Sequence, residues 1–312
     1  MVSIFFCTFA EYVLPQYRMK KLIFCILIGM FALSSMFAQR SEIGGLVGGS
    51  FYLGDLNPTG VFSQTQLAAG VIYRYNLNTR WTIRGNALWG TVKADDEKHN
   101  NEFQQNRNLS FRSRINEFSI QAEINFLPYF TGSRTRYRFS PYLFGGVGLF
   151  TFNPQAYRWD PYKNKGEWLD LARLSTEGQG LAEYPDKKFY NTTQICFPFG
   201  LGFKYSLNSI FAVGLEWGMR YTFTDYLDDV SGNYINREVL AREQGSVALE
   251  LADRSKNGPQ PEGSRLGSSN KTDWYSFAGV TLTAKIGTPN RASCPAHKQS
   301  GADRVRRSMG EL

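Results

Sequence analysis

Residues 211–225 alternate between two kinds of side chain over their whole length. The odd positions are large and apolar: Phe211, Val213, Leu215, Trp217, Met219, Tyr221 and Phe223. The even positions are small, polar or charged, and include Glu216 and Arg220. A period of two is that of a β-strand, whose successive side chains point to opposite faces. The segment is long for a soluble strand but suits a tilted crossing of a bilayer. We therefore expect a strand of a transmembrane barrel, with the odd face in lipid.

Seven further segments are interpreted as strands of the same sheet. They are residues 42–52, 67–76, 81–92, 114–126, 141–152, 193–205 and 274–286. Most alternate clearly, but 42–52 is glycine-rich with weak alternation, and 141–152 is apolar on both faces, so its phase stays open. A sheet without an open edge is the only way for strands to span lipid. The predicted fold class is all-β: an eight-stranded antiparallel transmembrane (outer-membrane) β-barrel with long extracellular loops.

The two ends of the chain are interpreted separately from the barrel. Residues 19–38 have the basic start, short apolar run and small-residue cleavage site of a signal peptide, with cleavage expected after Ala38. Residues 1–18 precede a second methionine and are interpreted as a start-site artefact, the alternative being a longer basic region. The expected organisation is a leader at 1–38, a barrel at 39–287 and a basic periplasmic tail at 288–312.

The connections between the expected strands differ in length and so predict an orientation. Residues 77–80 and 206–209 form tight turns, and the connection at 127–140 is somewhat longer. The connections at the other end of the barrel become longer along the chain, and the last two span residues 153–192 and 226–273. In outer-membrane barrels the short turns are periplasmic and the long loops extracellular. We therefore expect an outer-membrane protein of a Gram-negative bacterium with both termini in the periplasm.

The inward faces of the expected strands carry charges of both signs. These are Arg74, Arg84, Lys204, Arg220 and Lys285 against Glu117, Glu123 and Glu216. An eight-stranded barrel is just wide enough to be filled by side chains, and unpaired buried charges are costly. We expect a packed network of ion pairs here, with a gated ion path as the alternative.

Catalysis and cofactor binding are poorly supported by the residue pattern. His99 lies in a loop and His297 in the tail, and nothing in the spacing pairs either with a nucleophile or a carboxylate. The run from Asp225 to Asp229 could bind calcium but lacks the glycine-containing loop of a dedicated site, so a hydrogen-bonded strand end is preferred. We expect a non-enzyme with no cofactor, metal or small-molecule substrate. The net charge of +8 comes without a nucleic-acid motif, which favours anionic lipid or acidic protein partners.

Several motifs together resemble a known family. They are FYLGDLNP at 51–58, YRYN at 73–76, TEGQG at 176–180, TFTDYLDDVSG at 222–232 and LADRS at 251–255. The chain resembles the PorG-like outer-membrane barrels of Bacteroidetes, which are associated with the type IX secretion system. The resemblance covers about residues 40–297, and its motif residues at the expected outer rim are Gly54, Asp55, Asn57, Asp225, Tyr226, Asp228 and Asp229.

The resemblance implies a non-enzymatic subunit of the secretion machine that contacts a periplasmic ring built from a lipoprotein and a companion subunit. Basic side chains on the expected periplasmic side are the candidate contacts: Arg134, Arg136, Arg138 and Arg291. Two alternatives stay open. One is an OmpA/OmpX-like surface barrel that acts as an adhesin or receptor through its long loops, and the other is a small-solute channel.

Overall fold

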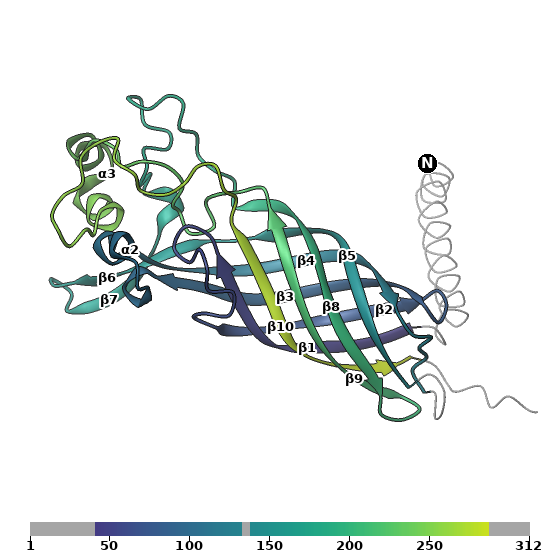
Figure 1. Ribbon diagram of the computed structural model, residues 1–312. Coiled ribbons are helices and arrows are strands. Elements are labelled where there is room, and N and C mark those ends of the chain that lie inside the picture. The colour runs from purple at the N-terminus through teal and green to yellow at the C-terminus, as the bar shows by residue number, and fades with distance from the viewer. Residues whose placement is uncertain (1–40, 133–137, 287–312) are drawn as a thin grey trace, which may run out of the picture. The chain divides into compact units, whose positions relative to one another are not determined.

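In the computed structural model, residues 41–132 and 138–286 are described, and their eight longest strands form one antiparallel barrel (Figure 1). These strands are β1 (Ser41–Leu53), β2 (Gln66–Asn76), β3 (Trp81–Asp95), β4 (Ser110–Asn125), β5 (Phe139–Thr151), β8 (Thr193–Ser206), β9 (Phe211–Thr222) and β10 (Trp274–Lys285). Each pairs with the next, and β10 returns to pair with β1 from Glu42↔Lys285 to Leu53↔Trp274. The predicted fold class is confirmed. The expected leader (1–38) and tail (288–312) lie outside the described residues.

The two faces of the barrel wall follow the alternation in the sequence. In β9 the even positions are buried, while Phe211 and Leu215 on the odd face are exposed. The phase of β5, which the sequence left open, is resolved: Tyr142, Phe144 and Phe150 point inward and are buried. The exposed face of the wall is apolar and includes Trp81 and Trp89, as a lipid-facing surface requires.

At one end of the barrel, two tight turns are stabilised by the same type of hydrogen bond, from backbone N–H groups to an asparagine side chain. In the β2–β3 turn, the Asn78 side-chain oxygen accepts hydrogen bonds from the backbone N–H groups of Arg80 (2.8 Å) and Trp81 (2.9 Å). In the β8–β9 turn, Asn208 accepts from Ile210 and Phe211, both at 2.8 Å. Asparagine favours turns because its side chain can replace a backbone acceptor in this way.

At the other end, residues 54–65, 96–109, 152–192 and 223–273 form a folded layer that we call the cap (Figure 1). It contains the hairpin β6 (Pro154–Asp160) and β7 (Lys165–Asp170), the 3₁₀ turns at Asp96–Lys98 and Leu171–Arg173, and the helices α2 (Glu102–Arg107) and α3 (Arg237–Ala252). The cap has apolar cores of its own, one around Leu240 and Ile235 and another around Leu171 and Leu251. Among the described residues, no helix is both long enough and apolar enough to cross a membrane.

Several boundaries differ from those predicted. The strand expected at 211–225 ends at Thr222, because the Thr222 hydroxyl donates to the carbonyl of Asp273 (2.6 Å) and the chain turns into the cap. The strands β3 and β4 are longer than expected and remain paired as far as Asp95↔Ser110. The helix α3 at Arg237–Ala252 is interrupted at Gly245, whose φ is 85°. The hairpin and α2 were not predicted.

Candidate functional site

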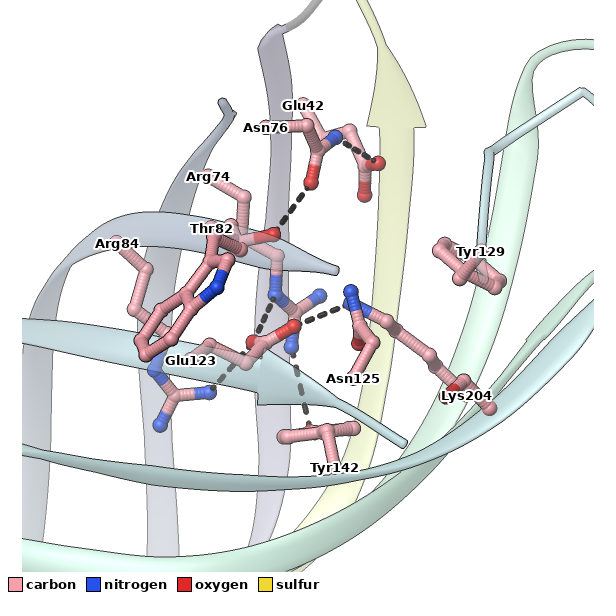
Figure 2. Close-up of polar contacts among 12 residues, drawn as sticks. Glu42, Arg74, Asn76, Thr82, Arg84, Glu123, Asn125, Tyr129, Tyr142 and Lys204 are labelled. Carbon is pink, nitrogen blue, oxygen red and sulfur yellow. Dashed lines mark hydrogen bonds and ion pairs between the residues drawn. The ribbon is translucent and has the colours of Figure 1, made fainter. Parts of the chain in front are cut away.

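The interior of the barrel is crossed by a network of buried ion pairs (Figure 2). Glu123 on β4 accepts from Arg74 Nε at 3.2 Å, lies 3.7 Å from Arg84 Nη1, and pairs with Lys204. Glu216 on β9 binds both terminal nitrogens of Arg84 at 2.6 and 2.8 Å. The Tyr142 hydroxyl donates to Glu216 at 2.8 Å. Six strands are thus cross-linked through two carboxylates, and each carboxylate has more than one cationic partner.

A second buried pair lies nearer the cap. Arg220 Nε donates to Glu117 at 2.8 Å, and Nη1 donates to the Gly218 carbonyl at 2.6 Å. Glu117 also accepts from the hydroxyls of Ser119 (2.9 Å) and Tyr275 (3.1 Å). Lys285, expected in the same network, lies apart from both groups, with its ammonium 4.4 Å from the centre of the Phe130 ring.

One interior carboxylate was missed by sequence reasoning. Glu42 on β1 is only 1% exposed. It accepts hydrogen bonds from Asn76 (2.7 Å), Thr131 (2.6 Å) and Thr283 (3.2 Å). The weak alternation of the glycine-rich β1 hid its phase. Glu42 and Tyr52 lie ten positions apart and so share the inward face, and both are buried, but the sequence of β1 alone does not show which of its faces is inward.

Aromatic rings complete the filling of the lumen. The Arg84 guanidinium lies 4.0 Å from the centre of the Phe144 ring, and that of Arg220 lies 4.7 Å from the centre of the Phe277 ring. Cations over aromatic faces are stabilised by the ring quadrupole. These side chains and the ion pairs together form a packed plug of the kind expected for a barrel of this size.

Where the barrel meets the cap, the motif aspartates are buried in a shared network. The Tyr52 hydroxyl lies 2.5 Å from Asp228 Oδ2 and 2.8 Å from Asp273 Oδ1. A phenol has one hydrogen to donate, so the second contact needs a proton on one of the two carboxyl groups. Burial raises the pKa of both Asp228 and Asp273 well above the ordinary value for aspartate, which fits such a bound proton.

Asp229, the next residue after Asp228, binds the cap segment 152–192. Its carboxylate oxygens accept from Thr176 (2.6 Å) and from Tyr190 (2.5 Å). The Tyr190 ring is stacked on that of Tyr226, with centroids 4.7 Å apart. Burial raises the pKa of Asp229 to about 7. Burial also raises the pKa of Asp225 to about 7, and its Oδ2 is buried without a hydrogen-bond partner.

The first motif is positioned by close backbone approach. Asn57 donates to the carbonyls of Tyr52 (2.6 Å) and Gly60 (2.8 Å). A Cβ on Gly54 would lie 1.9 Å from Asp273 Oδ1, so only glycine fits there. Asp55 accepts from the Ser268 N–H at 2.8 Å. Its pKa is raised by burial.

The sequence analysis also missed Arg107 and Asp96, whose hydrogen bonds link three segments of the cap. Arg107 donates to both carboxylate oxygens of Asp96 at 2.8 Å, to the Leu266 carbonyl at 2.7 Å and to the Asp55 carbonyl at 3.0 Å. Desolvation raises the pKa of Asp96. Within residues 41–132 and 138–286, no group of histidine, cysteine and acidic side chains is arranged to hold a metal ion.

Of the candidate partner contacts, Arg138 alone is described. It lies at the turn end of the barrel, where its guanidinium is 5.4 Å from the centre of the Tyr205 ring. Arg134, Arg136 and Arg291 lie outside the described residues.

A closed eight-stranded barrel with an apolar exterior and a charged, packed interior defines the class of this protein: it is a transmembrane β-barrel. Residues 20–172 match a family described only as a domain of unknown function, DUF6089. No curated protein is significantly similar in sequence.

Solved barrels resemble the chain at low sequence identity. Neisserial surface protein A is 8% identical, with a TM-score of 0.38 over 79% of this chain and 97% of that one. The N-terminal barrel of Pseudomonas aeruginosa OprF is 11% identical, with a TM-score of 0.32 over 78% and 98%. Ail, the attachment invasion locus protein of Yersinia pestis, is 9% identical, with a TM-score of 0.35 over 78% and 96%.

Proposed function

We propose that this chain is a non-enzymatic outer-membrane anchor that binds other macromolecules at the ends of its barrel. The observation that supports this most is the filled lumen. Glu123 and Glu216 hold Arg74, Arg84 and Lys204 across the bore, with side chains almost completely buried. Such a plug disfavours the solute channel, because opening a path would separate charges that have no other partner.

The proposed orientation has the cap outside the cell and the tight turns in the periplasm. It rests on the contrast between the two ends, since outer-membrane barrels have short periplasmic turns and long extracellular loops. The β2–β3 and β8–β9 turns span only a few residues, whereas the cap segment after β9 covers residues 223–273. Both termini then face the periplasm.

The more specific proposal is a subunit of the type IX secretion system that contacts the periplasmic ring lipoprotein and its companion subunit. Its support is the resemblance to PorG-like barrels. The motif residues Asp55, Asp228 and Asp229 bind backbone and side-chain donors within the chain, so they act in folding rather than as a contact surface. Docking is therefore assigned to Arg138 at the turn end, and to Arg134, Arg136 and Arg291, which we expect on the periplasmic side. An acidic ring surface would be their counterpart.

Cross-linking followed by purification in mild detergent tests this proposal. The docking variant changes Arg134, Arg136, Arg138 and Arg291 to Gln. The control changes the same number of cap cations, Lys98, Lys163, Arg173 and Lys188, to Gln. Recovery of ring proteins with the wild type and the control, together with loss of the ring proteins and of secretion in the docking variant, is the expected result. Full secretion by the docking variant would contradict it.

A surface receptor or adhesin is the second candidate, and the cap favours it. The hairpin β6–β7 presents Trp159, which is 53% exposed, and Tyr162, which is 98% exposed. Aromatic side chains of this kind are enriched at protein interfaces. Replacing residues 157–168 by a short turn should abolish binding to a surface ligand but leave secretion intact. If secretion fails and surface binding persists, the receptor role is wrong.

A further inference from the structure

A cleft of about 520 Å³ lies where the cap meets the barrel rim, beside the cap network, whose residues Asp55, Arg107 and Asp273 line part of it. Its lower wall includes Leu53 and Trp274, which are paired across β1 and β10. Its upper wall comes from the cap and includes Gln104, Arg265 and Lys271. The volume lies within the range of small-molecule sites, roughly 300–1,000 Å³.

The lower wall is continuous with the lipid-facing surface. The Trp274 ring packs edge-on against Tyr221, with centroids 5.0 Å apart, and against Phe199 at 6.0 Å. Phe199 belongs to the exposed apolar face of β8. Tryptophan and tyrosine are enriched at the level of lipid headgroups. The cleft therefore opens beside the bilayer, at headgroup depth, on the side of the cap.

The upper wall offers hydrogen-bond donors that the protein does not use. Gln104 is only 4% exposed, yet its Nε2 has no hydrogen-bond partner. The Arg265 Nε donates to the Gly267 carbonyl at 3.1 Å, and the residue lines the cleft. Lys271 is exposed in the same wall. A buried amide donor without a partner is costly, so an acceptor from a ligand would remove that cost.

The two carboxyl groups of the cleft, by contrast, already have donors within the protein. Asp55 Oδ2 accepts from Ser268, and Asp273 accepts from Tyr52 and from the Leu227 N–H. The Gln104 amide has a donor without a partner, whereas the carboxyl groups of the cleft already accept hydrogen bonds. This arrangement favours a ligand that has oxygen acceptors and negative charge. Phosphate has this chemistry, and arginine and lysine are its usual protein partners.

We propose that the cleft binds the phosphorylated headgroup of a lipid from the leaflet on the cap side. Arg265, Lys271 and Gln104 hold the phosphate oxygens, and the acyl chains run past Leu53 and Trp274 into the bilayer. The position of the bound headgroup depends on where the cap lies relative to the bilayer, and it does not depend on a role in secretion. It differs from general attraction of basic residues to anionic membranes, because it requires these particular donors.

The test uses the full-length protein, purified and kept in dodecyl maltoside, a detergent that carries no phosphate. The probes are lipid A with its phosphates, the dephosphorylated lipid A, and inorganic phosphate. Binding is measured by native mass spectrometry and by titration. The cleft variant is Arg265→Gln with Lys271→Gln, and the control is Lys163→Gln with Arg173→Gln, which removes the same charge elsewhere on the cap.

We expect the wild type and the control to retain phosphorylated lipid A, and the cleft variant to bind it about tenfold more weakly, a loss of about 1.4 kcal/mol. Gln104→Glu, which places a carboxylate at the unpartnered amide, should also weaken binding. Equal losses in the cleft and control variants would overturn the proposal in favour of nonspecific charge. Equal binding of the dephosphorylated lipid would overturn the phosphate assignment. Displacement by low concentrations of inorganic phosphate would show a free-phosphate site instead.

Discussion

Glu123 is the residue on which the interior network depends most. It faces Arg74, Arg84 and Lys204 together, and its own side chain is fully buried. We expect Glu123→Gln to destabilise the barrel by about 3–5 kcal/mol, because buried cations would lose their counter-charge. Unfolding in urea, followed by tryptophan fluorescence, measures this. Glu250→Gln is the matched control: it breaks an exposed ion pair with Arg158 and should cost only about 0–1 kcal/mol. Equal costs would mean that the network contributes no more than a surface pair.

Leu215 tests the lipid face at the same scale. It is 62% exposed on β9, and Leu215→Arg should cost about 2–4 kcal/mol if the site is near the bilayer centre. Leu215→Ala is the control, because it keeps the face apolar. The neighbouring Gly214 is a poor control despite facing inward, since a Cβ there would lie 2.9 Å from the Phe203 carbonyl and 2.7 Å from Thr281 Oγ1. A barrel that tolerates Leu215→Arg as well as Leu215→Ala would contradict a lipid-facing position.

The interior residues that could be predicted from the sequence are those in strands with clear alternation. Strict alternation placed Arg84, Glu216 and Arg220 inside the barrel, because a period of two fixes the face of every residue once one face is known. Glycines removed that signal in β1, so Glu42 was missed. No local pattern could pair Arg107 with Asp96 or Tyr52 with Asp228, since each partner is selected by how the cap folds over the rim.

At the scale of elements, the buried aspartates make the stability of the cap depend on pH. The pKa of Asp229 is about 7 in the folded cap, against about 3.9 for an unfolded aspartate. The folded cap therefore holds a proton that the unfolded segment releases. The bound proton stabilises the folded cap. This contribution to the free energy of unfolding is complete below about pH 4 and is lost as the pH rises to about 7. Asp225, with its pKa also raised to about 7, acts in the same direction.

We therefore expect the cap to be cleaved by protease more slowly at pH 5 than at pH 8. The comparison uses a protease with similar activity at both values, or hydrogen exchange corrected for intrinsic rate. Asp229→Asn resembles the protonated form and should flatten the dependence, whereas Asp186→Asn, at an exposed position, should leave it unchanged. A cap that becomes more resistant as the pH rises would contradict the predicted sign.

The elements differ in how far sequence could predict them. Barrel strands are long and amphipathic, so all eight could be predicted from the sequence, and so could the phase of every strand except β1 and β5. The hairpin β6–β7 is short and lies inside a long connection, and Leu171 and Leu251, which pack beside it, are far apart in sequence. Its stability comes from tertiary contacts that a local window does not contain, which explains why the cap was expected as loops.

At the scale of the whole molecule, the two ends of the barrel differ enough to be distinguished by chemistry on living cells. Tyr162 at the hairpin tip and Leu207 in the β8–β9 turn are both exposed, at 98% and 47%, and lie at opposite ends of the barrel. Cys7 and Cys25 belong to the expected leader. In a Cys294→Ser background, the remaining cysteine of the expected mature chain is Cys196, which is fully buried. A cysteine introduced at either exposed position is then the main target for a maleimide that cannot cross the outer membrane.

With the cap outside, Tyr162→Cys should label on intact cells, and Leu207→Cys should label only after the outer membrane is permeabilised. Lysed cells give the maximum labelling of each variant and correct for differences in reactivity. The unsubstituted background should stay unlabelled until the barrel is heat-denatured, because the wall protects Cys196. Labelling of Leu207→Cys on intact cells, with Tyr162→Cys silent, would reverse the orientation. The basic turn end would then face the exterior, and the proposed docking to a periplasmic ring would fail with it.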